Sequence, residues 1–186
     1  MSDNGNPPRH LLLGTVDWQR DDWLHSYYPE DIPPDWRLAY YANDCDCVML
    51  PAQHWRGRDI EAMAEQVDAA PATLRCFVAV EPGDAERVAP LLDALGPARA
   101  VILVDREDVS FGPLPHWVAV GGDHWCDRDS DAELVRWAEY GGDLRAARTR
   151  AQALNPAVTA LVVDGPQAGP ADIQALRTLL QLLGRA

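Results

Sequence analysis

The chain has 186 residues, of which 47% are apolar and 24% are charged, and its formal net charge is −13 at pH 7. A chain of this length is expected to form one domain that buries roughly two thirds of the surface exposed by its unfolded form. The negative charge opposes binding to a phosphate backbone, so we expect no nucleic-acid partner. All 16 basic residues are arginine, which excludes Schiff-base chemistry and a Walker-type lysine.

Two further features of the sequence bear on its compartment. No apolar run approaches the roughly 18 residues that span a bilayer, and MSDNGNPPRH at the start lacks the basic region and apolar stretch of a secretory signal. We therefore expect a cytoplasmic protein with no membrane partner, whose four cysteines are reduced thiols. Residues 1–9 are expected to form a flexible tail on a single domain that covers residues 1–186.

Apolar, β-branched segments of strand length recur along the chain. Runs such as AVILVD and TALVVD are almost continuously apolar, which is typical of parallel strands that helices cover on both faces. We therefore expect about six mainly parallel strands. They cover residues 10–16, 45–50, 74–81, 98–105, 115–120 and 157–164.

Segments with helical spacing separate most of the expected strands. Asp84 precedes and Gly96 follows one such segment, and Ser130 with Glu133 forms a capping box that predicts a helix over AELVRWAEY. The other apolar stripes with helical spacing are Ile60, Met63 and Val67; Val88, Leu91, Leu92 and Leu95; Leu144, Ala147, Ala151 and Leu154; and Ile173, Leu176, Leu180 and Leu183.

The alternation of strand and helix predicts an α/β domain with a mostly parallel sheet. The connection over residues 105–115 breaks this pattern, because REDVSFGPL has no helical spacing. A crossover between adjacent parallel strands usually needs a dozen or more residues. We therefore expect the strands on either side of this connection not to be simple parallel neighbours.

Several motifs resemble the YecE-like family, also called domain of unknown function seventy-two, which has a TIM-barrel fold. LGTVDW, YYPEDIPP and LAYYANDCDCVMLP are similar to the start of that family, which typically reads G-T-S-G-W, F-Y-P-x-x-L-P and Y-Y-A. WVAVGGDHWCDRDSDAELVRWAEY and ALVVDGPQAGPADIQALRTLL are similar to its last third. The residues that depart from the family's pattern at polar positions are Val16, Asp17, Met49, Glu81, Val120 and Gly121.

The resemblance implies a TIM-barrel-like α/β fold that is shortened internally. A full barrel has eight strand–helix units and about 250 residues, whereas the sequence pattern provides about six strands, and the missing units fall at residues 105–115. We therefore expect an incomplete or reduced barrel with helices outside. An open barrel exposes strand edges, so we also expect a homo-oligomer, such as a homodimer, that forms through the open edge.

Acidic residues stand where most of the expected strands end. The carboxyl ends of parallel strands meet at one edge, where ligands bind. Carboxylates gathered there repel one another, and a divalent metal ion would relieve that repulsion and activate water. Acids at strand ends also cap helices and close turns, so both interpretations stay open. The predicted metal ligands are Asp17, Glu81, Asp105, Asp123, His124 and Asp164.

Aromatic residues gather after the first expected strand and form a second candidate site. They could stack on a sugar or a base beside Asp17, or they could fill the barrel mouth and pack the first helices. His54 follows the second strand and is a candidate ligand or general base. The predicted ligand-binding residues are Asp17, Trp18, Trp23, Tyr28, His54 and Trp125.

These patterns leave two functions open. The first is an uncharacterised YecE-like protein that is non-catalytic or binds a small ligand. The second is a divalent-metal-dependent hydrolase that uses the acids at the strand ends. The sequence does not decide whether the protein is an enzyme, and it predicts neither a substrate nor a catalytic residue.

Overall fold

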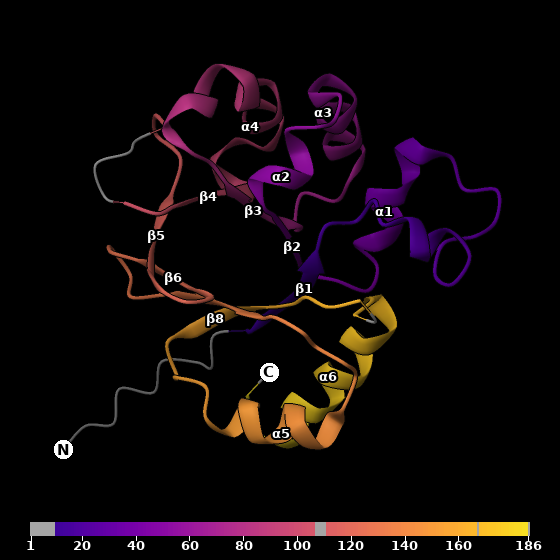
Figure 1. The fold of residues 1–186 in the computed structure, drawn as a ribbon, viewed down its shortest axis with the longest axis vertical. Coiled ribbons are helices and arrows are strands. Elements are labelled where there is room, and N and C mark those ends of the chain that lie inside the picture. Colours follow the sequence, from indigo (N-terminus) through magenta and orange to yellow (C-terminus); the bar gives the residue numbers. More distant parts are fainter. Residues whose placement is uncertain (1–9, 107–110, 167, 186) are drawn as a thin grey trace.

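Eight strands form a closed barrel in the computed structural model, which describes residues 10–106, 111–166 and 168–185 (Figure 1). The strands follow one another around the barrel in chain order. They are β1 (Leu12–Val16), β2 (Cys47–Leu50), β3 (Arg75–Ala79), β4 (Ala100–Val104), β5 (His116–Gly121), β6 (His124–Asp127), β7 (Glu133–Trp137) and β8 (Val158–Val163). The flexible tail predicted over residues 1–9 lies outside the described residues.

The barrel is mainly parallel, with one reversed strand. β1 to β5 pair in parallel, and β8 pairs in parallel with both β7 and β1. β6 runs antiparallel to β5 and β7. The expected α/β barrel with helices outside is confirmed, but the prediction of about six strands in an incomplete barrel is wrong, because eight strands of the described chain close the ring. An open strand edge therefore no longer supports the predicted homo-oligomer.

β4 and β5 are parallel neighbours, and their register pairs Leu103 with Trp117. The expectation that these two strands are not simple parallel neighbours is wrong. An extended chain covers about 3.3 Å per residue, and a strand of five residues is only about 17 Å long. Residues 105–115 are therefore enough to return to the start of the next strand without a helical crossover.

Two strands in the last third of the barrel were missed at the sequence level. β6 starts directly after a turn that contains Gly121 and Gly122, both of which have positive φ. β7 occupies the segment for which the capping box predicted a helix, and that prediction is wrong. Leu134 packs inside the barrel, whereas Val135 and Trp137 pack outside it, as expected for alternating side chains on a strand.

Helices flank the barrel on two sides (Figure 1). α3 and α4 pack together beside β3 and β4, and α5 and α6 pack together beside β8 and β1. The helices are η1 (Asp21–Leu24), η2 (Pro34–Trp36), α1 (Arg37–Tyr41), α2 (Ala52–Trp55), α3 (Ile60–Ala69), η3 (Pro82–Asp84), α4 (Ala85–Arg99), α5 (Leu144–Gln152) and α6 (Pro170–Leu182). None of the helices in the described chain has both the length and the apolar character that crossing a bilayer requires.

Local sequence signals explain where the longer helices begin and end. Asp59 caps α3 by accepting a hydrogen bond from the backbone N–H of Ala62, and Asp143 caps α5 in the same way through Arg145. At Gly96, φ is 62° and ψ is 175°, so the helical backbone of α4 is interrupted there, as the sequence predicts. The predicted apolar stripes thus correspond to α3, α4, α5 and α6.

The barrel interior is filled with side chains. Alternate residues of the strands point inward and pack into a single apolar cluster, while the others pack against the helices. Ligands therefore have to bind at the ends or on the outer wall of this barrel, as in other packed α/β barrels. The buried members of the interior cluster are Val16, Cys47, Met49, Phe77, Val101, Leu103, Trp117, Trp125, Ala132, Leu134, Ala160 and Val162.

Candidate functional site

Asp17 follows β1 in a strained backbone conformation. Its φ is 63°, in the left-handed region that residues other than glycine rarely adopt. The family that the sequence resembles has glycine at this position, and glycine adopts this conformation without strain. The backbone N–H of Asp17 donates to the carbonyl of Met49 (2.9 Å), and its own carbonyl accepts a hydrogen bond from the Thr15 hydroxyl (3.0 Å). The neighbouring strand and side chains therefore hold Asp17 in place.

The carboxylate of Asp17 is buried and accepts five hydrogen bonds. Oδ1 accepts from the backbone N–H groups of Trp18 (2.7 Å) and Gln19 (3.0 Å). Arg58 donates to both oxygens, at 2.8 and 2.6 Å, and Nδ1 of His54 lies 2.9 Å from Oδ2. Burial alone would raise the pKa of Asp17, but the hydrogen bonds from His54 and Arg58 outweigh it and hold the pKa well below its ordinary value. Asp17 is therefore ionised at neutral pH.

This carboxylate orients His54. An ionised carboxylate can only accept a hydrogen bond, so Nδ1 of His54 carries the proton that points to Asp17. Trp55 fixes the short helix α2 by donating from its indole to the carbonyl of Ala79 (3.0 Å). The side chain of His54 is 32% exposed, and within the described chain Nε2 makes no hydrogen bond. In the neutral ring, Nε2 therefore presents a lone pair toward solvent.

Arginines balance the charge of other acids at the carboxyl-end rim. Arg56 lies 2.8 Å from Glu81. Arg136 donates to Asp123 at 2.8 Å and lies 3.7 Å from Asp164. The reversal of β6 brings Asp123 to this rim, because the turn between β5 and β6 lies at the carboxyl end of β5. Glu81, Asp123 and Asp164 therefore belong to ion pairs and do not form a concentration of unbalanced negative charge.

The predicted metal ligands do not form one group. Asp105 and His124 are exposed, and the other four candidates are paired with arginines. In residues 10–106, 111–166 and 168–185, no three His, Cys, Asp or Glu side chains are placed so that they could hold one metal ion. Guanidinium groups relieve the repulsion that motivated the metal hypothesis. A metal site stays a prediction that the ligand geometry does not support.

The aromatic candidates lie in the core. Trp18, Trp23 and Tyr28 are 0%, 3% and 5% exposed. The indole of Trp18 donates to Gln66 of α3 (2.9 Å), and the hydroxyl of Tyr28 donates to the carbonyl of Trp18 (2.6 Å). Trp125 belongs to the cluster inside the barrel. Of the two interpretations of these rings, their burial favours packing over a stacking surface for a ligand.

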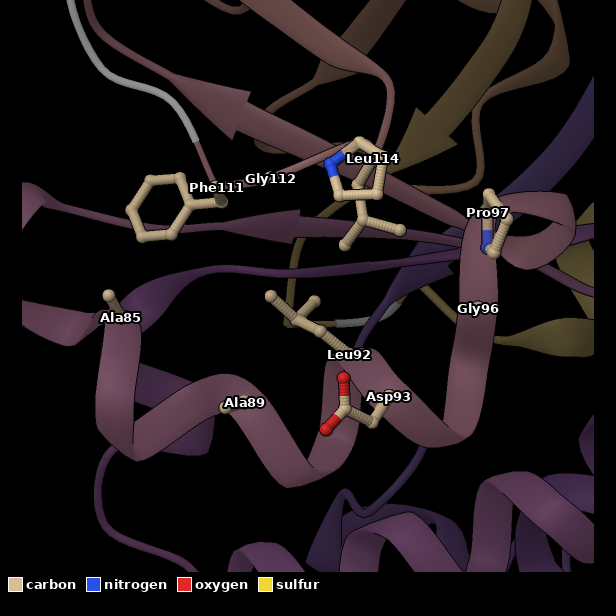
Figure 2. Close-up of a pocket in the computed structure, with 10 residues that line it drawn as sticks. Ala85, Ala89, Leu92, Asp93, Gly96, Pro97, Phe111, Gly112 and Leu114 are labelled. Carbon is tan, nitrogen blue, oxygen red and sulfur yellow. The ribbon is translucent and has the colours of Figure 1, made fainter.

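A groove separates α4 from residues 111–114 (Figure 2). It has a volume of about 550 Å³, and Leu92 and Leu114 face each other across it. Asp93 is ionisable, and the other residues that line the groove are neutral. This groove is apolar, and it brings together no set of side chains suited to acid–base or nucleophilic chemistry. The residues that line it are Ala85, Ala89, Leu92, Asp93, Gly96, Pro97, Phe111, Gly112, Pro113 and Leu114.

The arginine partners of the rim were missed in the sequence-based prediction. Arg58 and Arg136 decide the charge of the site, yet neither was among its candidates. A signal exists for Arg58, because it stands four positions after His54 in QHWRGR, and a buried acid requires a countercharge. For Arg136 there is no such signal, because the sequence predicts a helix where the structure has the strand β7. Its contact with Asp123 could therefore not be predicted.

The comparisons with known proteins agree with the barrel fold. The sequence profile of the family described as "Protein of unknown function DUF72" matches residues 12–82, which include Asp17, His54 and Arg58. No curated protein matches the chain significantly. The crystal structure of a DUF72 family protein from Thermotoga maritima is similar in fold, with a TM-score of 0.56 and 13% sequence identity over 92% of this chain and 99% of that chain. Residues 12–82 of this chain are therefore similar to the DUF72, or YecE-like, family, and the fold of the chain is similar to that of a DUF72 family protein.

Proposed function

We propose that this protein is a small-ligand-binding α/β barrel whose ligand binds at the carboxyl-end rim and donates a hydrogen bond to Nε2 of His54. One observation carries this proposal: a buried carboxylate holds a partly exposed imidazole in a single orientation. An exposed histidine on a surface helix needs no such support. Asp17 therefore has a role beyond packing, namely to fix the tautomer of His54.

The strain at Asp17 supports the same proposal. A residue other than glycine at positive φ costs roughly 1–2 kcal/mol and persists where the surrounding structure fixes it. The family pattern has glycine here, so the fold itself does not need a carboxylate at this position. Asp17 adds a charged group and two side-chain partners, His54 and Arg58, at the expense of this strain. Such an exchange is typical of binding and active sites.

The charge of the site indicates the kind of ligand. Arg58 balances the negative charge of Asp17, so the neutral form of His54 would accept a hydrogen bond without a net charge beside it. This favours a ligand that carries hydroxyl or N–H groups, such as a sugar or a nucleoside.

The proposal can be tested by nuclear magnetic resonance on the ¹³C-labelled protein. Glucose, xylitol and adenosine are titrated while the ring signal of His54 is observed. We expect at least one of these compounds to shift that signal, and we expect its affinity to fall at least tenfold in H54Q. His25→Gln is the matched control, because His25 is exposed and should not affect binding. Equal affinity of H54Q and the wild type would remove the role of His54.

The Asp17–His54 pair also favours a second candidate function, which is proton transfer. A histidine that a carboxylate orients through Nδ1 can accept a proton at Nε2 from a bound substrate. This activity would use the same site and the same variants. The metal-dependent hydrolase that the sequence left open has weaker support, because arginines rather than neighbouring acids surround Asp17, Glu81 and Asp123.

A further inference from the structure

A second cleft lies on the outer wall of the barrel, between the strands β5 to β7 and the end of α5. Its volume is about 650 Å³, within the range of pockets that hold small molecules. In the described chain, no helix stands between β5, β6 and β7 in the sequence, and the lining of the cleft includes Val120, which is 55% exposed. The residues that line the cleft are Val120, Gly121, Gly122, Asp123, His124, Glu133, Val135, Arg136, Trp137, Arg150, Ala153, Leu154, Asn155 and Val158.

Arg150 is the distinctive residue of this cleft. Its guanidinium carbon lies 4.6 Å from the centre of the Trp137 ring, an arrangement in which the cation rests on the aromatic face. Within the described residues, the guanidinium of Arg150 makes no hydrogen bond and no ion pair. Arg136 in the same cleft is different, because Asp123 and Asp164 balance its charge. Arg150 therefore offers its N–H groups without a protein acceptor.

The surroundings of Arg150 favour an anionic ligand. Desolvation lowers the pKa of Arg150, and the negative charge of Asp123 partly opposes this effect. A guanidinium that rests on a ring keeps its N–H edge free in the plane of the group, and that edge fits the two oxygens of a carboxylate. Arg150 is an exposed residue, so an incoming carboxylate would replace water at its N–H groups with charge-assisted hydrogen bonds.

The other residues of the cleft limit the charge and shape of the ligand. Asp123 and Glu133 are acidic and repel a dianion more strongly than a monoanion. Val120, Ala153 and Leu154 are at least partly exposed and provide apolar surface against which a hydrocarbon or aromatic body could pack. A ligand with one carboxylate and an apolar body therefore fits better than a phosphate ester.

We propose that this outer-wall cleft binds a small apolar monocarboxylate, whose carboxylate pairs with Arg150 and whose body packs on Val120, Ala153 and Leu154. The site is separate from His54, because His54 does not line the cleft. It therefore does not depend on the function proposed for the rim.

The experiment uses 4-fluorobenzoate as the probe and follows its binding to the full chain by ¹⁹F nuclear magnetic resonance in carboxylate-free buffer. We expect binding to the wild type and at least a tenfold loss of affinity in R150Q. Arg148→Gln is the matched control, because Arg148 is an exposed residue of α5 outside the lining of the cleft. R148Q and H54Q should both bind the probe as the wild type does. Circular dichroism verifies that R150Q is folded.

Two related compounds test the chemistry of the proposal. 4-Fluorobenzamide has nearly the same shape but no charge, and we expect it to bind at least tenfold more weakly. 4-Fluorophenyl phosphate carries more negative charge and should also bind more weakly than the carboxylate. The proposal is overturned by any one of three results: no binding of 4-fluorobenzoate at millimolar concentration, equal binding by R150Q, or tighter binding of the amide or the phosphate.

Discussion

A β-carbon on Gly14 would lie 1.8 Å from the carbonyl oxygen of Cys47. The two residues face each other in the parallel register of β1 and β2. The contact is with backbone, so no side chain can rotate away to make room. Gly14 therefore fixes how closely the first two strands of the barrel approach, directly below the site at Asp17.

Gly14→Ala is expected to destabilise the fold by about 3 kcal/mol or more, because a buried strand must move to accommodate one methyl group. Urea unfolding measures the change in the free energy of unfolding. Gly57→Ala is the control, since a β-carbon there would meet no atom within 4 Å, and it should change stability by less than about 0.5 kcal/mol. Similar stability of the two variants would contradict the close approach of β1 and β2.

Substitutions of Asp17 separate its backbone strain from its charge. Asp17→Ala removes the acceptor of Arg58 and His54, and we expect a loss of about 3 kcal/mol, which is typical when one partner of a buried ion pair is removed. Asp17→Gly loses the same hydrogen bonds but adopts φ of 63° without strain. D17G should therefore be more stable than D17A by about 1 kcal/mol. The opposite order in urea unfolding would show that the positive φ is not a source of strain.

The stability that Asp17 contributes should decrease in acid. Its pKa in the folded protein is lower than the ordinary value of 3.8, so the unfolded chain takes up the proton first as the pH falls. The contribution is complete above about pH 4 and is lost as the pH approaches the folded pKa. Relative to Asp17→Asn, the wild type should lose about 1 kcal/mol of its advantage between pH 5 and pH 3. Urea unfolding of both proteins at these two pH values measures the difference between their free energies of unfolding. The same difference at pH 5 and pH 3 would mean that the pKa of Asp17 is not lowered in the folded protein.

Trp125 should be essential for packing inside the barrel. It is 9% exposed and belongs to the interior cluster, so Trp125→Ala is expected to cost about 3–5 kcal/mol. Trp36, which is 67% exposed, provides the control, and Trp36→Ala should change the free energy of unfolding by less than about 0.5 kcal/mol. If W125A kept the stability of W36A, β6 would not contribute its indole to the core.

Divalent metals should not stabilise this protein. A metal present at 100 times its dissociation constant would add about 2.7 kcal/mol and raise the melting temperature by roughly 5–10 °C for a chain of this size. We expect no rise with Mg²⁺, Mn²⁺ or Zn²⁺, because arginines balance the rim acids. A rise that chelation reverses would restore the metal hypothesis, and loss of the rise in D17N would assign the metal to this site.

The parts of the fold that local patterns determine could be predicted from the sequence. The continuous apolar run of β4 and the stripe of Ile173, Leu176 and Leu180 in α6 indicate their elements directly. β7 could not be predicted in this way, because its sequence carries a helical capping box. Pairing with β6 on one side and β8 on the other overrides that local preference.

The candidate site was only partly predictable for a similar reason. Asp17 and His54 were found because they follow strands, and the ends of parallel strands meet at one rim. The contact of Asp17 with Arg58 spans 41 positions and depends on how the segment between α2 and α3 folds back toward the end of β1. Trp18 and Tyr28 were ambiguous, because the same ring types serve as core residues and as ligand platforms.

The reversed strand β6 has a consequence for how small such a protein can become. Barrels of eight strands commonly need about 250 residues, and this chain closes its ring with 186. Because β6 is connected to both neighbours by hairpins, the chain needs no crossover helices there, and the barrel still has eight strands. The circumference of a barrel depends on the number of strands and on their stagger, and it does not depend on the direction of each strand. A shortened chain can therefore keep the circumference of an eight-stranded barrel while its strands β5 to β7 are connected without helices.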